Sequence, residues 1–500
     1  MHKILITLQK TKNLSFLTER TQIHSRWYFV ALLVISIIIL SSCKPETVTV
    51  ATPESSPTPK ASPTKTSTSL PTLTPTATQQ PDWFLPDEDL KDTKISLVHP
   101  WSGEIATQME TLVSRFNAEN QWGIEVTAHG MGSAQQVFQQ SEAGIVIGNG
   151  PQVVIAPIEE LAYWFKQGYL ISLDKYIQDS THGLDVKTLE DFFPPFWQQD
   201  IVNGEQLGIP VSRDVHFLLY NQTWAKDLGF TNSPVNFSQF NAQTCAAGAA
   251  LAHDNRIDNN GMGGWIINRS DLVLLSWLRG FGIADFPEQE MIYQYNQPQT
   301  IKAFTYIRKL FDEGCAWVSR NPTPYEYFAN RQALIISADL NDLDPLESIM
   351  QIAGNEDQWV VLPYLSETGD PVVLPQGSSL GILRSSKAQE LASWIFIRWL
   401  NEPDQQLELA KANADLPVTN KLLSEFSNTR DENWQAVVAM LAYIQPAPRT
   451  SDWRIARFVL PDAFFQTLQI HIMPDQFPEI VRLLDETILS LYDLPASSGW

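Results

Sequence analysis

The chain has 500 residues, 44% of them apolar and 11% aromatic, which at ~150 residues per domain is enough for about two to four folded domains. The 56 acidic residues outnumber the 34 basic ones and give a formal charge of −22. No run of Lys and Arg is long enough to contact a phosphate backbone, so we expect no nucleic-acid partner. Three cysteines and histidines without metal-ligand spacing predict neither a disulfide scaffold nor a zinc site, and no cofactor is expected.

The first 42 residues have the pattern of an export signal peptide. Five Lys and Arg and one Glu precede residue 27, and residues 27–40 carry no charge. Because a bilayer-spanning helix needs ~20 apolar residues, this shorter run favours a cleaved signal. The sequence Leu40-Ser41-Ser42-Cys43 resembles a bacterial lipobox, which implies that Cys43 is lipidated and becomes the first mature residue. The alternative is an uncleaved signal anchor in which Cys43 is an incidental thiol.

Residues 43–82 are expected to form a disordered tether. Between Lys44 and Pro81 the chain has eleven Thr, five Ser and eight Pro, and few side chains that would form a core. Cleavage before Cys43 removes five bases and one acid and leaves a charge of −26. Because anionic lipids repel such a chain, acyl groups would hold it at the cell membrane, facing the periplasm or the extracellular side.

Strands and helices alternate after the tether. Apolar, β-branched runs predict strands at 94–98, 123–127 and 151–156. Between them, apolar residues at helical spacing predict helices around 109–116 and 134–144. This alternation predicts an α/β fold with a mainly parallel sheet.

Several short motifs follow in a fixed order between residues 94 and 490: Gly150-Pro151-Gln152-Val153-Val154, Gly168 to Asp174, Gly208-Ile209-Pro210 before Leu219-Tyr220-Asn221, Tyr327 to Ile336, Gly381-Ile382-Leu383 before Ala392 to Pro403, and Leu416-Pro417-Val418. Together they resemble the bacterial extracellular solute-binding proteins of the maltose-binding type, the capture subunits of ABC importers. Gln152 stands where that family usually has Asp.

The resemblance implies a periplasmic-binding-protein-like fold, in which two α/β lobes joined by a hinge enclose a ligand cleft. It places lobe one at 83–209 plus 364–411 and lobe two at 210–363 plus 412–500. The hinge candidates are 208–211 and 360–363, for which ordinary strands ending at a turn are the alternative. Ligand-binding loops collect at the strand ends that face such a cleft.

Two cysteines remain if Cys43 is lipidated. An even pair in an exported domain favours a disulfide, which would join Cys245, in a helix predicted at 237–252, to Cys315, after a helix predicted at 301–314. The alternative is two buried free thiols that behave as small apolar residues.

The same resemblance gives most of the candidate ligand contacts, and Trp277 is added as a tryptophan that suits the core and the site equally. Tryptophans suit a sugar site because their faces stack on sugar rings while nearby carboxylates and amides bind hydroxyls. Core packing is the alternative for each tryptophan, and a surface salt bridge for the Arg213–Asp214 pair. The candidate ligand-binding residues are Trp101, Arg213, Asp214, Trp265, Trp277, Asp339, Asn341, Ser378 and Trp453.

These features predict a lipid-anchored, monomeric protein that binds a small solute, most readily a sugar or oligosaccharide, and passes it to an ABC permease. No G-x-S-x-G, HExxH or P-loop motif occurs, so we expect no catalytic residues. A surface-anchored glycan-acting hydrolase, or a binding or sensor module without an importer, is the alternative. Relatives also bind polyamines, polyols and glycerol phosphates, and the charge of −26 disfavours an anionic solute.

Overall fold

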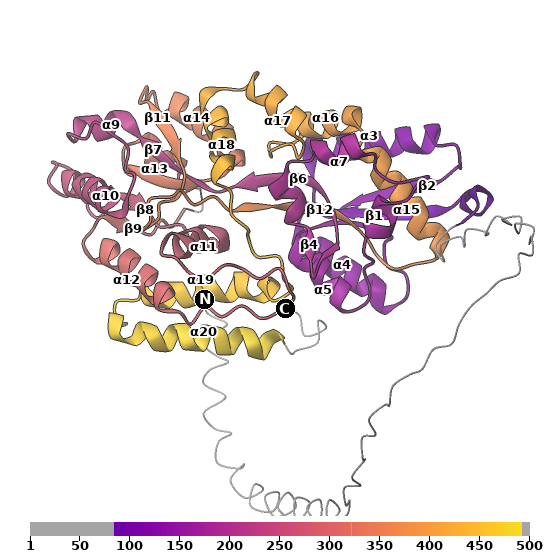
Figure 1. Ribbon diagram of the computed structural model, residues 1–500. Helices are drawn as coiled ribbons and strands as arrows, with labels where there is room; N and C mark the ends of the chain where they lie inside the picture. Colours follow the sequence, from indigo (N-terminus) through magenta and orange to yellow (C-terminus); the bar gives the residue numbers. More distant parts are fainter. Residues whose placement is uncertain (1–84, 322, 493–500) are drawn as a thin grey trace, which may run out of the picture. The chain divides into compact units, whose positions relative to one another are not determined.

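The computed structural model describes residues 85–321 and 323–492 (Figure 1). The predicted signal peptide, the lipidated Cys43 and the tether at 43–82 lie outside the described residues. Among the helices that are described, none combines the length and the apolar character needed to cross a bilayer.

A first five-stranded sheet has the strand order β2-β1-β3-β12-β6. Its strands are β1 (Lys94–His99), β2 (Glu125–Gly130), β3 (Val153–Ala156), β6 (Ile209–Val215) and β12 (Pro375–Ile382). The strand β1 runs parallel to β2 and β3, whereas β12 returns from a distant part of the chain and runs antiparallel to β3 and β6. We call the part of the molecule built on this sheet the first lobe.

A second five-stranded sheet has the order β11-β7-β10-β8-β9 and forms the second lobe. Its strands are β7 (Phe217–Asn221), β8 (Trp265–Ile266), β9 (Ala316–Trp317), β10 (Ile335–Ala338) and β11 (Trp359–Leu362). Here β8, β9 and β10 are parallel and β7 is antiparallel to β10 and β11. In each sheet four strands run in one direction and one strand, β12 or β7, runs in the opposite direction, so the prediction of an α/β fold with a mainly parallel sheet is confirmed.

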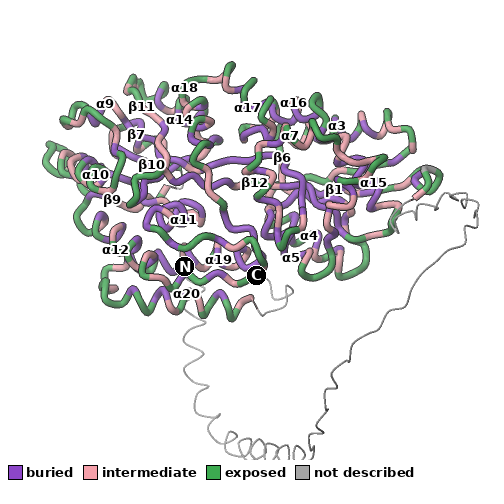
Figure 2. The backbone as a smooth tube through the Cα atoms, in the orientation of Figure 1, coloured by how far each residue is buried: buried purple, intermediate pink, exposed green. Residues whose placement is uncertain are grey.

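Helices cover both faces of the first sheet because successive side chains of a strand point to opposite faces. Ile95 and Leu97 of β1 pack in one core cluster with helices α3 (Gly103–Glu119) and α15 (Lys387–Leu400), whereas Val98 packs in another with α4 (Ala134–Val146) and α5 (Ile158–Lys166). Figure 2 shows these strands as buried segments beneath exposed helix surfaces. The remaining helices of residues 94–216 are α6 (Asp174–Ile177), α7 (Val186–Asp191) and α8 (Pro194–Gln198), and a short hairpin joins β4 (Ile201–Val202) to β5 (Glu205–Gln206).

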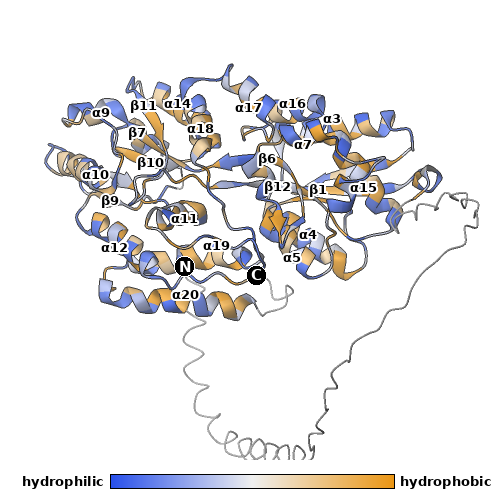
Figure 3. Ribbon diagram, in the orientation of Figure 1, coloured by the Kyte–Doolittle hydropathy of each residue, from blue (hydrophilic) through white to orange (hydrophobic). Residues whose placement is uncertain are grey.

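The second core is built from helices whose hydrophobic residues recur along one side, as the colouring of α12 and α20 illustrates (Figure 3). The helices between β7 and β12 are α9 (Gln222–Asp227), α10 (Phe237–Ala252), α11 (Asp271–Gly280), α12 (Pro298–Asp312), α13 (Tyr325–Ala329) and α14 (Leu343–Ile352). After α15 the chain forms α16 (Pro403–Ala412), α17 (Asn420–Ser427), α18 (Glu432–Met440), α19 (Trp453–Thr467) and α20 (Phe477–Tyr492). Short 3-10 helices are η2 (Asp87–Leu90), η3 (Leu340–Asp342), η4 (Leu441–Tyr443) and η5 (Pro474–Gln476).

The predicted elements at the start of the folded part agree closely with the structure. The strand expected at 94–98 is β1, and the helix expected at 134–144 is α4. Ser133 caps the start of α4, because its side chain accepts a hydrogen bond from the Gln136 N–H. The unusual Gln152 ties the start of β3 to β1, because its side-chain oxygen accepts from the Ser96 N–H at 2.9 Å. An amide at this position thus satisfies a backbone group of the sheet.

The chain passes from the first sheet to the second at a single residue, His216, between β6 and β7. The hinge candidate 208–211 includes the start of β6, and the candidate 360–363 includes the end of β11. Most residues of both segments therefore belong to strands. The lobe boundaries predicted from the sequence stay a prediction.

Cys245 of α10 and Cys315, just before β9, form the predicted disulfide. It lies beside an unusually close backbone contact. Gly264 has φ +36°, and a Cβ at that position would lie 1.8 Å from the Cys315 carbonyl oxygen, so only glycine fits there. The disulfide and Gly264 together hold α10, β8 and β9 side by side.

Candidate functional site

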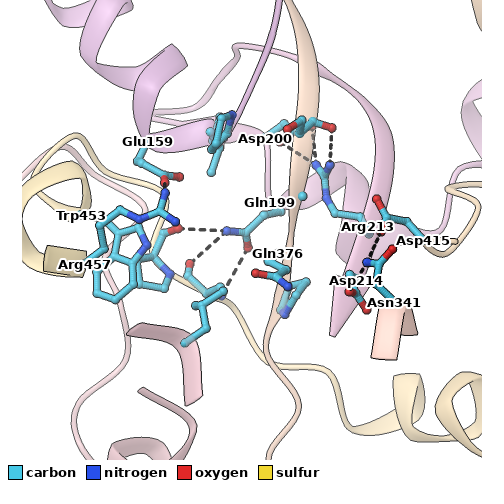
Figure 4. A pocket seen from close by; sticks show the side chains of 18 residues that line it. Glu159, Gln199, Asp200, Arg213, Asp214, Asn341, Gln376, Asp415, Trp453 and Arg457 are labelled. Atoms are coloured by element: carbon cyan, nitrogen blue, oxygen red, sulfur yellow. Dashed lines mark hydrogen bonds and ion pairs between the residues drawn. The ribbon is translucent and has the colours of Figure 1, made fainter. Parts of the chain in front are cut away.

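A cavity of about 230 Å³ is lined by residues of both lobes (Figure 4). The first lobe contributes the start of α5, the two residues after α8 and parts of β6 and β12, and the second lobe contributes parts of α11, η3 and α19. The polar residues of its lining are Glu159, Gln199, Asp200, Arg213, Asp214, Asn341, Gln376, Ser378, Asp415 and Arg457, and Trp453 supplies an aromatic ring. A ligand in this cavity would contact both lobes, which is the condition for stabilising one relative position of them.

Arg213 of β6 is almost fully buried, at 2% exposure, and its guanidinium is held by the first lobe. One terminal nitrogen lies 2.8 Å from both carboxylate oxygens of Asp200, and the other donates to the Ser378 carbonyl at 2.8 Å. Burial raises the pKa of Asp200, and the charge of Arg213 and the Ser379 hydroxyl act against that rise. Arg213 therefore connects α8, β6 and β12, and both of its terminal nitrogens already have acceptors.

Asp214, the next residue of β6, accepts hydrogen bonds from the N–H groups of Val215 at 2.7 Å and Leu340 at 3.3 Å. The Asn341 amide nitrogen lies 3.4 Å from Asp214 and 3.3 Å from Asp415, so it joins the two carboxylates. Within the described residues, neither carboxylate has an ion pair with Lys or Arg. Burial, and then the nearby charges of Asp339 and Asp415, raise the pKa of Asp214 well above its usual range.

The other side of the cavity is closed by an ion pair between the lobes. Arg457 Nη1 of α19 lies 2.9 Å from Glu159 Oε1 of α5, and Arg457 Nε lies 3.0 Å from Asp271 Oδ2 of α11. Burial raises the pKa of Glu159, and the charge of Arg457 opposes this. One turn before Arg457, Trp453 begins α19 and forms part of the cavity wall.

Gln199 holds the segment before α19 against the first lobe. Its side-chain nitrogen donates to the carbonyls of Ala447 and Pro448, both at 3.2 Å, and its side-chain oxygen accepts from the Ala447 N–H. Figure 4 shows this amide at the centre of the cavity wall. With both groups of the amide bonded to the backbone, Gln199 positions the 447–448 segment that the ligand would meet.

Five of the candidate ligand contacts line this cavity: Arg213, Asp214, Asn341, Ser378 and Trp453. They come from four separate segments of the chain that the fold brings together. For Arg213, the hydrogen bonds described above give a structural role, and the Ser378 carbonyl accepts from it. The remaining four residues stay candidate ligand contacts: Asp214, Asn341, Ser378 and Trp453.

The other four candidates lie elsewhere. Trp265 and Trp277 are completely buried in the second core, with ring centres 4.9 Å apart, and both rings pack against Phe240 of α10. Asp339 caps η3 by accepting from the Asn341 N–H. Trp101 is half-buried, its ring centre 5.5 Å from that of His99, and it does not line the cavity. We therefore place Trp265 and Trp277 in the core.

The sequence prediction missed several residues that line the cavity, chiefly Glu159, Gln199, Asp415 and Arg457. Glu159 was within reach of prediction, since it follows the carboxyl end of a parallel strand, where cleft residues gather. Arg457 stands four residues after Trp453, so on a helix both lie on the same side. Asp415 directly precedes the motif Leu416-Pro417-Val418, which could have indicated it, whereas Gln199 lies outside all of the motifs.

One cluster of potential metal ligands occurs in the described part of the chain, formed by Cys245, Glu313 and Cys315. Its two sulfur atoms are joined in the disulfide and are not thiolates. This cluster is therefore not a metal-binding site while the disulfide is intact.

A model of the family described as "Bacterial extracellular solute-binding protein" matches residues 111–442, which is more than half of the chain. The chain belongs to this family. A curated relative is the sn-glycerol-3-phosphate-binding periplasmic protein UgpB of Shigella flexneri serotype 5b, which is 21% identical over 362 residues that cover 68% of this chain and 77% of the relative.

Solved structures of other binding proteins have the same fold. The cyclic alpha-maltosyl-1,6-maltose binding protein from Arthrobacter globiformis is 17% identical and aligns with a TM-score of 0.64, covering 80% of this chain and 99% of that protein. UgpB from Mycobacterium tuberculosis, in complex with glycerophosphocholine, is 14% identical with a TM-score of 0.61, and the alignment covers 80% and 99% of the two chains. These similarities confirm the periplasmic-binding-protein-like fold, with its two lobes and the cleft between them.

Proposed function

We propose that this family member captures a sugar or oligosaccharide in the cavity between its lobes and delivers it to the permease of an ABC importer. The observation that carries the proposal is the cavity itself, since its lining comes from strands β6 and β12 of the first lobe and from α11, η3 and α19 of the second. A solute that contacts both lobes favours the conformation in which they are close, and a permease can distinguish that conformation from the unliganded one.

The lining supports a hydroxyl-rich solute over an anionic one. Both arginines of the cavity are paired, Arg213 with Asp200 and Arg457 with Glu159 and Asp271. Asp214 and Asp415 have no basic partner in the described chain, so this side of the cavity offers hydrogen-bonding groups to sugar hydroxyls and no positive charge to a phosphate. A glycerol phosphate, the ligand of the Shigella flexneri relative, would favour an unpaired cation in the cavity, and neither arginine of this cavity is unpaired.

We also propose that the protein acts as a monomer held at the membrane through lipid on Cys43, and that it has no catalytic activity. A lipobox-like sequence precedes Cys43, and the family and the similar structures are binding proteins. Labelling cells with an alkyne fatty acid tests the anchor: the wild-type chain is expected to incorporate label and sediment with membranes, whereas Cys43→Ala does neither. Label-free wild-type protein would refute lipidation.

The binding proposal is tested by thermal unfolding of the full chain with a panel of mono- and oligosaccharides, polyols, polyamines and sn-glycerol 3-phosphate. A bound solute at 100 times its dissociation constant adds ~2.7 kcal/mol to the free energy of unfolding. We expect one class of sugar to raise the melting temperature and to be recovered unchanged. Hydrolysis of the sugar would favour the glycan-hydrolase alternative, and a shift by glycerol phosphate alone would refute the sugar assignment.

A further inference from the structure

The two lobes also meet outside the cavity, at a cluster of five residues around the end of α20. Lys166, which ends α5, and Asn203, in the turn between β4 and β5, belong to the first lobe. Glu290, Ser451 and Tyr492 belong to the second lobe, in the segment before α12, the segment before α19 and the end of α20. None of the five lines the cavity. We call this cluster the interlobe tie.

Tyr492 is the centre of the interlobe tie. It ends α20, which packs along α19 in the second lobe (Figure 1). Its hydroxyl donates to Glu290 Oε1 at 2.9 Å and accepts from the ammonium of Lys166, which lies 4.0 Å from the centre of the tyrosine ring. The hydroxyl of Ser451 lies 3.0 Å from that of Tyr492. One side chain of the second lobe thus contacts a cation of the first lobe and an acid of its own.

Glu290 connects this tyrosine to a second point on the first lobe. Its carboxylate also accepts from the N–H and the hydroxyl of Ser451, which fixes its position. Its own N–H donates to Asn203 Oδ1 at 2.8 Å, and the Asn203 N–H donates to the Glu288 carbonyl at 3.2 Å. The interlobe tie therefore joins both α5 and the β4–β5 hairpin to one segment of the second lobe.

The hairpin turn presents Asn203 to the second lobe in a conformation that its own sequence favours. Val202 and Glu205 pair across the hairpin, so Asn203 and Gly204 form a two-residue turn. Their φ angles are +54° and +78°, as in the type I′ turn for which Asn-Gly is preferred. Because this geometry is local to the first lobe, Asn203 can keep it when the lobes separate and bond Glu288 and Glu290 again when they meet.

The bonds of the interlobe tie are weak enough to break and form reversibly. Lys166 and Asn203 are exposed, Glu290 and Tyr492 are half-buried, and only Ser451 is buried. Hydrogen bonds and ion pairs between such groups each change an equilibrium modestly, because water replaces them when they break. Since none of these bonds involves a ligand, they also favour the closed arrangement, with the lobes together, in the solute-free protein.

We propose that the interlobe tie is a conformational device that keeps the lobes together without solute and so raises the affinity of a cavity that it does not touch. The measured dissociation constant is the intrinsic one divided by the fraction of molecules in the binding-competent arrangement. This effect on affinity rests on the proposed function, whereas the effect on the lobes does not. Ser451 and Tyr492 lie beyond residue 442, where the family match ends, so membership of the family does not assign the tie.

Double electron–electron resonance on the solute-free full chain tests the proposal. Spin labels at Gln140→Cys on α4 and Lys309→Cys on α12, both exposed positions, report the distance between the lobes. Cys43→Ala leaves these as the only free thiols, because the other two cysteines form the disulfide.

Two conservative variants break the interlobe tie at separate points. Tyr492→Phe removes the hydroxyl and keeps the ring beside Lys166, and Asn203→Gly removes the side-chain acceptor while Gly-Gly still suits the turn. The matched control is Tyr443→Phe, which changes an exposed tyrosine of η4 that is not part of the tie. Circular dichroism of each variant checks that it is folded.

We expect a mainly short distance in the wild type and in the Tyr443→Phe control. Tyr492→Phe and Asn203→Gly should each raise the ratio of open to closed molecules about fivefold, the effect of one net hydrogen bond, and the double variant about 25-fold. Distance distributions in all three that match the wild type would overturn the proposal.

A solute identified by the thermal panel provides a second readout. Its affinity should fall in each variant by the factor by which the closed fraction falls, although neither side chain lines the cavity. Unchanged affinity in variants that do open would overturn the proposed effect on binding. Absence of any solute would count against the proposed function alone, because the distance measurement uses no ligand.

Discussion

Glu159 of α5 and Arg457 of α19 form an ion pair of 2.9 Å that joins the first lobe to the second, and Arg457 also reaches Asp271 at 3.0 Å. The two acids lie in different lobes, so one guanidinium neutralises charge on both sides of the cleft. Because the pair lines the cavity between the lobes, a ligand bound there would lie next to it.

Replacing Arg457 with Met should destabilise the fold most strongly above neutral pH. Glu159 is 5% exposed, and loss of one partner of a buried pair costs ~3–5 kcal/mol. Without Arg457 the pKa of Glu159 rises further than burial already raises it, so the native state holds a proton that the unfolded state releases, and the free energy of unfolding falls as pH rises. Urea unfolding at pH 5 and pH 8 measures this difference.

The double variant Glu159→Gln with Arg457→Met is the control for that experiment. It removes the buried charge along with its partner, so we expect it to recover most of the lost stability at pH 8. Equal losses for Arg457→Met at both pH values would contradict the role assigned to Glu159.

The two tryptophans Trp453 and Trp265 are expected to behave differently when each is changed to Phe. Trp453 lines the cavity between the lobes, so Trp453→Phe should weaken solute binding several-fold through the smaller ring contact. Trp265 is completely buried in the second core, so Trp265→Phe should lower the melting temperature and leave affinity unchanged. Titration with the solute measures the affinity of both variants, and thermal unfolding measures their stability. Weaker binding by Trp265→Phe would show that Trp265 belongs to the ligand site.

These two tryptophans also show which features of the structure can be predicted from the sequence. A tryptophan after two glycines near a strand suits a cleft and a core equally well from sequence alone. Trp265 is in the core because Gly264 brings its backbone against Cys315, which turns the side chain under α10. Such a contact between residues far apart in the chain has no local signal. The α/β elements, by contrast, follow from apolar spacing within each segment, and they were predicted to within a few residues.

Arg213→Met is expected to cost about 3–5 kcal/mol of stability, because Asp200 would be left completely buried without its charge partner. Arg213→Lys should recover only part of this, since an ammonium cannot reproduce the bonds of a guanidinium to both oxygens of Asp200. Denaturant unfolding of both variants checks the order. A large loss of affinity in Arg213→Lys at unchanged stability would show that Arg213 contacts the solute directly.

The raised pKa of Asp339 leads us to expect a specific dependence of stability on pH. Burial and the charge of Asp342 raise its pKa to about 6 from 3.8. Between these values the native state holds more protons than the unfolded state, so this group lowers the free energy of unfolding as pH rises from 4 to 7. Asp339→Asn keeps an oxygen that accepts from the Asn341 N–H and does not titrate. Its stability should therefore exceed that of the wild type by on the order of 2 kcal/mol at pH 7 and match it near pH 4.

Asp185 serves as a control because its pKa is shifted in the opposite direction to that of Asp339. It accepts from the Thr188 N–H at the start of α7, and this hydrogen bond lowers its pKa. Asp185→Asn should therefore become less stable than the wild type as pH rises through 4, since the ionised carboxylate stabilises the native state only above that pH. Differential scanning calorimetry of both variants at pH 4, 5.5 and 7 compares the two slopes. If the two variants diverge from the wild type in the same direction, burial beside Asp342 does not control the titration of Asp339.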